Sequence, residues 1–187
     1  MPDRDVKTIR DLIFFQYAKI IACSAFKCAN GKEAKKKSYG FIKKTFRDLQ
    51  SGRKNWSDIL REDLQFVERE KTCVYCGSTE NIEREHIVPK SLKINERCPA
   101  CDKIQGIHNM IWACKHCNTS KNDRGLYTFY KELKAPEPKF YDLLDPLAEK
   151  KYLKTIYDCH ACAGTLDAAD LDGDGVMTVL DLDFILK

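Results

Sequence analysis

Four Cys-x-x-Cys pairs constrain the fold of this chain more than any other feature of its sequence. They are Cys73/Cys76, Cys98/Cys101, Cys114/Cys117 and Cys159/Cys162, and they account for all but two of the ten cysteines. Two thiolates separated by two residues cover one side of a tetrahedral metal ion, and a second such pair completes the site. Because we expect an intracellular protein, in which disulfides are rare, this spacing indicates zinc.

Two pairings of these cysteines are predicted. Cys73/Cys76 and Cys114/Cys117 form one structural zinc site, which supplies folding free energy to a short segment rich in loops. Cys98/Cys101 and Cys159/Cys162 form a second zinc site that ties the C-terminal region to the centre of the chain. For these last two pairs, separate reduced thiols or a redox couple are the alternative. Cys23 and Cys28 are predicted to be core thiols.

Composition and hydropathy are those of a soluble globular protein, with 43% hydrophobic and 32% charged residues. The longest apolar run, residues 12–26, contains Gln16 and Lys19 and is shorter than the roughly 20 residues that span a bilayer. Acidic residues precede this run and it has no clear cleavage site, so it is a poor signal peptide. We therefore expect a cytoplasmic protein without a membrane segment.

Charge is distributed unevenly along the chain. Residues 27–54 carry ten Lys or Arg against Glu33 and Asp48, a balance of +8, whereas residues 158–187 carry seven Asp against one Lys, a balance of −6. A dense basic stretch attracts a polyanion such as nucleic acid. The alternative is a solvated helix face.

The periodicity of apolar residues predicts helices over 6–26, 33–49, 55–70 and 140–157. Short strands are predicted over 81–88 and 108–114, and residues 119–133 can form a helix interrupted near Gly125. The predicted fold class is α+β. It has a helical, basic N-terminal region (1–70), a zinc-clamped core (71–134), and a C-terminal helix with an acidic metal-loop tail (135–187).

The first zinc site has a chemical consequence for its neighbours. It holds the strand with Glu85 and His86 against the strand that starts at Asn109 and the helix that begins near Asn118. A carboxylate, an imidazole and a carboxamide then lie close together, a donor set that suits a divalent cation such as Mg²⁺. Taken singly, a Glu-His pair is most often a surface feature, and the two asparagines are most often turn or cap residues.

These residues resemble the HNH nuclease family. "EHIVP", Asn109 and "CKHCNTSK" match its pattern of an acidic residue before a histidine, a central asparagine and a final Cys-x-x-Cys-Asn-x-x-Lys. The resemblance covers about 72–125 and implies the ββα-metal (His-Me) finger fold. It also implies that His86 is the general base, that Glu85 and Asn118 hold a catalytic Mg or Mn ion, and that Asn109 orients the histidine loop. Glu85 stands where most members have Asp, and Asn118 where many have His.

The function that this resemblance implies is metal-dependent endonuclease cleavage of phosphodiester bonds, with double-stranded DNA as the expected partner. Lys90, Lys121 and Arg124 are candidates for phosphate contacts, or else ordinary surface charges. A zinc-stabilised nucleic-acid-binding module without catalysis is the rival hypothesis. Binding alone needs basic and aromatic residues rather than a cation site, which favours the enzyme.

The stretch "DLDGDGVMTVLD" has the spacing of an EF-hand calcium loop. The ligand positions are occupied by Asp170, Asp172, Asp174, Val176 and Asp181, with a glycine at the sixth position. Asp closes the loop where Glu is usual, and in this the loop resembles a dockerin half-repeat. The sequence therefore predicts a calcium site, with an acidic turn as the alternative. A calcium-regulated adaptor is a third functional hypothesis, which rests on this tail alone.

Overall fold

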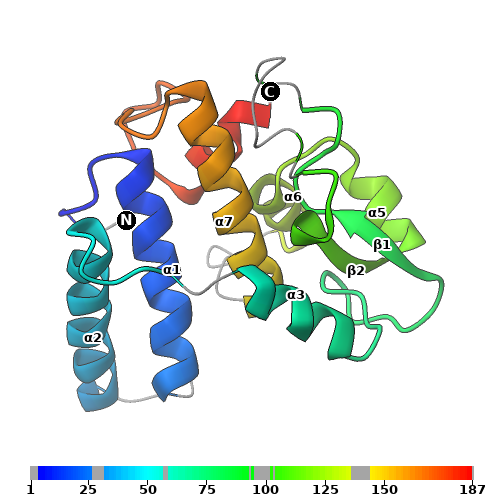
Figure 1. The fold of residues 1–187 in the computed structure, drawn as a ribbon, viewed down its shortest axis with the longest axis horizontal. Helices are drawn as coiled ribbons and strands as arrows, with labels where there is room; N and C mark the ends of the chain where they lie inside the picture. Colours follow the sequence, from blue (N-terminus) through cyan, green and yellow to red (C-terminus); the bar gives the residue numbers. More distant parts are fainter. Residues whose placement is uncertain are drawn as a thin grey trace.

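The computed structural model describes residues 4–26, 32–56, 59–92, 94, 102, 104–135 and 144–186. The predicted α+β class is confirmed, since the helices accompany a small two-stranded antiparallel sheet that lies at one side of the molecule (Figure 1). No helix within these ranges is both long enough and apolar enough to cross a membrane.

The sheet and the helix after it form the ββα unit that the HNH resemblance implies. β1 (Ile82–His86) pairs with β2 (Met110–Cys114), and His86 lies opposite Met110. A 3-10 turn, η1 (Ile107–Asn109), leads into β2, and α5 (Lys115–Lys121) follows it directly. His86, the last residue of β1, and the first turn of α5 therefore lie on the same side of the unit.

Two helices pack on this unit and on the segment before it. α3 (Ile59–Glu68) packs on β2, where the Phe66 and Trp112 rings stack with centroids 4.8 Å apart. The Trp112 indole N–H also donates to the Phe66 carbonyl at 3.2 Å. α6 (Leu126–Leu133) begins after Gly125, at the predicted interruption, and its Phe129 ring meets Tyr75 edge-on at 5.0 Å.

The N-terminal helices pack against the C-terminal one. α1 (Ile9–Phe26) lies between α2 (Lys32–Gln50) and α7 (Pro146–Ala163) (Figure 1). Burial from two sides explains why apolar residues occur on most faces of α1, whereas α2 is apolar on one face and basic on the other. The Phe14 and Tyr157 rings stack with centroids 5.8 Å apart between α1 and α7.

The ends of α7 follow from its local sequence. The Asp145 carboxylate accepts the backbone N–H groups of Leu147 and Ala148, Pro146 takes the first helical position, and Gly164 ends the helix at φ 71°. The prediction that the last cysteine pair follows this helix was wrong. The helix continues to Ala163, and both cysteines of that pair lie in its final turns.

The acidic tail docks on the core through η3 (Val179–Leu186). The buried Asp183 carboxylate accepts the backbone N–H of Thr128 at 2.6 Å and the Tyr152 hydroxyl. It therefore caps the N-terminus of α6 from outside, because Gly125 has no side chain to do so.

Candidate active site and metal centre

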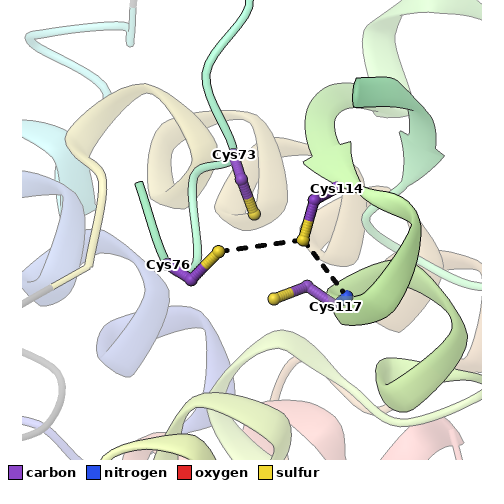
Figure 2. A group of neighbouring side chains, drawn as sticks. All are labelled: Cys73, Cys76, Cys114 and Cys117. Carbon is purple, nitrogen blue, oxygen red and sulfur yellow. Dashed lines mark hydrogen bonds between the residues drawn. The ribbon is translucent and has the colours of Figure 1, made fainter. Parts of the chain in front are cut away.

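Four thiols meet where the segment before β1 approaches the end of β2. The sulfur atoms of Cys73, Cys76, Cys114 and Cys117 all lie within 4.8 Å of one another (Figure 2). The Sγ atoms of Cys76 and Cys114 are 3.7 Å apart. Thiolates at about 2.3 Å from a tetrahedral zinc ion lie about 3.8 Å from each other. The cluster is therefore compatible with a structural zinc site.

Local geometry builds this cluster from short segments. Gly77 adopts φ 78° and donates its N–H to the Cys73 carbonyl at 2.9 Å, which closes the turn that carries the first two cysteines. The Cys114 sulfur accepts the Cys117 N–H at 3.4 Å at the start of α5. The other two cysteines thus come from the junction of β2 and α5.

A pocket of about 440 Å³ opens beside this junction. It is lined by β1, the loop after it and α5, and its residues include Glu85, His86, Lys90, Asn118 and Asp123. The structure therefore brings together the carboxylate, the imidazole and the carboxamide that the sequence singles out.

Glu85 is buried at the wall of this pocket and is 3% exposed. Its Oε1 accepts the Tyr75 hydroxyl at 3.0 Å and pairs with Lys121 Nζ at 3.0 Å. Its Oε2 has no hydrogen-bond partner among the described residues. Burial raises the pKa of Glu85, and the Lys121 charge offsets only part of that rise. A buried carboxylate oxygen without a partner fits a site where a cation binds.

His86 is half-buried at the end of β1. Its Nε2 lies 3.5 Å from the Gln105 carbonyl. Burial lowers the pKa of His86, the Gln105 carbonyl opposes this, and Lys90 and Lys121 lower it further. The imidazole is therefore neutral at pH 7, the state in which it can accept a proton.

Asn118 is oriented by a residue that the sequence analysis missed. Its Nδ2 donates to Glu83 Oε1 at 2.6 Å, so the amide oxygen remains to act as a ligand. Glu83 lies two residues before Glu85, on the same side of β1, and this alternation was the signal that could have identified it.

Asn109 lies under the loop that follows His86 and is fully buried. Its Oδ1 accepts the Val88 N–H at 2.8 Å, and its Nδ2 donates to the carbonyls of Val88 at 2.6 Å and Ile104 at 2.9 Å. The carboxamide thus fixes the course of this loop without lining the pocket.

The family model of the HNH endonuclease matches residues 73–124. Residues 73–124 are an HNH domain. No curated protein and no solved structure matched the chain.

The three cations predicted to contact phosphates at the HNH domain differ in position. Lys90 is exposed and lines the pocket. Lys121 is 1% exposed and paired with Glu85, so its position does not suit a phosphate contact. The Arg124 guanidinium pairs with Glu132, and its Nε donates to the Lys121 carbonyl at 3.2 Å, so it stabilises the end of α5.

The predicted second zinc site lies partly outside the described residues, which do not include Cys98 and Cys101. Cys159 is not disulfide-bonded, whereas Cys162 is. A disulfide sulfur is not the thiolate that zinc requires, so Cys162 in this state is not a zinc ligand. The prediction that Cys23 is a thiol was also wrong, since Cys23 is disulfide-bonded. Cys28 lies outside the described residues.

The acidic loop that follows α7 has its carboxylates in two groups. Oxygen atoms of Asp170, Asp172 and Asp174 lie within 4.8 Å of one another. Asp170 accepts the N–H groups of Gly173 and Gly175, each at 2.8 Å. Asp181 is buried and accepts the N–H groups of Leu171 at 3.1 Å and Thr178 at 2.7 Å, and Val176 is exposed. Backbone hydrogen bonds thus define the loop.

Proposed function

We propose that this chain is a metal-dependent endonuclease that hydrolyses phosphodiester bonds in double-stranded DNA. The observation that supports this is the convergence of Glu85, His86 and Asn118 on one pocket of the HNH domain. A module that only bound nucleic acid would have no need of a buried carboxylate oxygen without a hydrogen-bond partner at that place.

Glu85 Oε2 and the Asn118 amide oxygen are the atoms that would hold the cation, because both are hard oxygen donors. Mg²⁺ or Mn²⁺ suits this donor set and, when bound, neutralises charge on the scissile phosphate.

Side chains of the protein would transfer the proton, hold the loop after β1 and bind the phosphate backbone. His86, neutral at pH 7 because burial lowers its pKa, takes a proton from the attacking water. Asn109 keeps the loop after His86 in place through three hydrogen bonds. Lys90, exposed at the rim, provides a positive charge to the phosphate backbone.

Replacement of the base tests this proposal. His86→Ala should lower plasmid nicking and linearisation at least about a hundredfold, the lower end of what a positioned base contributes. Zinc content, measured by elemental analysis, should stay unchanged, because the cysteine cluster does not involve His86. Activity should require added Mg²⁺ or Mn²⁺.

Cys114→Ser is the matched structural variant and should reduce both zinc content and folded structure. If the folded wild type binds DNA but cuts neither DNA nor RNA with any of these cations, the domain is a binding module and the proposal is wrong.

A calcium ion at Asp170, Asp172 and Asp174 is a separate part of this proposal, supported by their convergent oxygen atoms. Isothermal titration with Ca²⁺ should give one binding event in the wild type and none in Asp170→Ala. A wild type that shows no heat of binding would identify the loop as an acidic turn.

A further inference from the structure

One face of α3 carries an apolar stripe that no other described part of the chain covers. Leu60, Leu64 and Val67 are 58%, 61% and 61% exposed. Their spacing of four and three residues places them in one row along the helix. α3 lies at the edge of the molecule (Figure 1). Large apolar side chains that are exposed in a continuous row mark an interaction surface.

The opposite face of α3 is fixed in place, so the helix cannot turn to bury the stripe. The Phe66 ring stacks on Trp112, and the Asp63 carboxylate pairs with Lys151 Nζ at 2.7 Å. The Glu62 carboxylate pairs with Lys154. All three α3 side chains are buried, and breaking either ion pair would leave an unpaired charge inside the protein.

The charges beside the stripe identify what fits it. Arg61 and Glu68 are both exposed on the same flank of the row, one at each end, and neither forms an ion pair within the described residues. A second α3 packed antiparallel would place Arg61 of each copy opposite Glu68 of the other. Such flanking pairs set the partner and the direction of packed helices. The surface is therefore complementary to itself.

We propose that this chain forms a two-fold symmetric homodimer in which the α3 helices pack antiparallel across the row of Leu60, Leu64 and Val67. The inference does not depend on the activity of the HNH domain. Its consequence is that two HNH domains are held in one particle, because α3 packs directly on β2. A two-fold contact of this kind uses the same patch on both subunits.

Sedimentation equilibrium of the full chain up to about 1 mM tests the contact. The wild type should show a concentration-dependent dimer, and Leu64→Lys should be monomeric over the same range. Leu133→Lys, which places the same change at an apolar residue 38% exposed on α6, should dimerise like the wild type. Circular dichroism should show that all three proteins are folded. A wild type that stays monomeric, or a dimer that Leu64→Lys does not weaken, would overturn the proposal.

Reversal of the flanking charges tests the antiparallel direction. Arg61→Glu alone and Glu68→Arg alone should each raise the dissociation constant about tenfold, since each puts like charges together at two places. The double variant, Arg61→Glu with Glu68→Arg, should return it to within about threefold of the wild type. If the double variant is as weak as the single ones, these residues do not face each other and the antiparallel arrangement is wrong.

Discussion

Glu83 acts on the candidate site through a single contact, the one with Asn118. It accepts the Asn118 amide N–H at 2.6 Å and so determines which amide atom is left for a cation. Such a residue orients a metal ligand without touching the metal. Its removal typically lowers metal affinity about 10- to 100-fold.

We therefore expect Glu83→Ala to raise the Mg²⁺ or Mn²⁺ concentration for half-maximal cutting about tenfold, with most of the maximal rate restored at saturating cation. Cation titrations of DNA cleavage measure this. Glu83→Gln keeps an accepting oxygen and should show a smaller shift, and Glu80→Ala, at an exposed carboxylate, should show none. A loss of maximal rate without a change in cation requirement would assign Glu83 a different role.

At the scale of elements, α6 and η3 depend on each other. A Cβ added at Gly125 would lie 2.2 Å from Asp183 Cγ, the same carboxylate that caps α6. The absence of a side chain at Gly125 is thus what permits the tail to dock.

Gly125→Ala should therefore lower the free energy of unfolding by about 1–3 kcal/mol, the cost of overpacking a buried contact. It should also increase hydrogen exchange at the Thr128 amide, which Asp183 protects. Urea unfolding and amide exchange measure the two effects. Gly40→Ala on exposed α2, where nothing lies within 4 Å of the new Cβ, should instead stabilise by about 0.5–1 kcal/mol. Equal effects at both glycines would contradict this account.

Across the whole molecule, His160 connects α7 to the tail. Its Nδ1 lies 2.8 Å from the Thr165 hydroxyl and its Nε2 lies 3.2 Å from the Leu182 carbonyl in η3. Burial lowers the pKa of His160 to about 4, against 6.5 for an ordinary histidine, although the Leu182 carbonyl opposes the shift. The folded protein thus holds this ring neutral well below neutral pH.

Between pH 6.5 and 4 the unfolded chain binds a proton at His160 that the folded chain does not. The contribution of His160 to the free energy of unfolding is fully present above pH 6.5. It decreases as the pH falls towards 4, by about 3 kcal/mol in total. Urea unfolding at several pH values, compared with His160→Gln, isolates this contribution from that of the carboxylates. An equal pH dependence in the two proteins would show that His160 does not protonate on unfolding.

Local patterns in the sequence were sufficient for the elements and for most of the site. Cysteine spacing and strand alternation predict the strands and the four-thiol cluster, and the resemblance carried by "EHIVP" and "CKHCNTSK" implies the ββα unit and the grouping of Glu85, His86 and Asn118. Each motif is local, but the pairing of motifs distant in sequence came from the ligand number of zinc and from the family resemblance. The ends of α7 could likewise be read from Asp145, Pro146 and Gly164, although the predicted helix stopped before the last cysteine pair.

What only the tertiary structure decided is the environment of each side chain. Lys121 and Lys90 are both lysines near the motif, yet one is buried against Glu85 and the other faces the pocket. Glu83 gains its role only when α5 brings Asn118 beside it. The stripe on α3 stays exposed because Glu62, Asp63 and Phe66 hold the opposite face. Which side chains are buried, and which contact one another, depends on segments distant in sequence. Residue type and spacing alone therefore do not determine them.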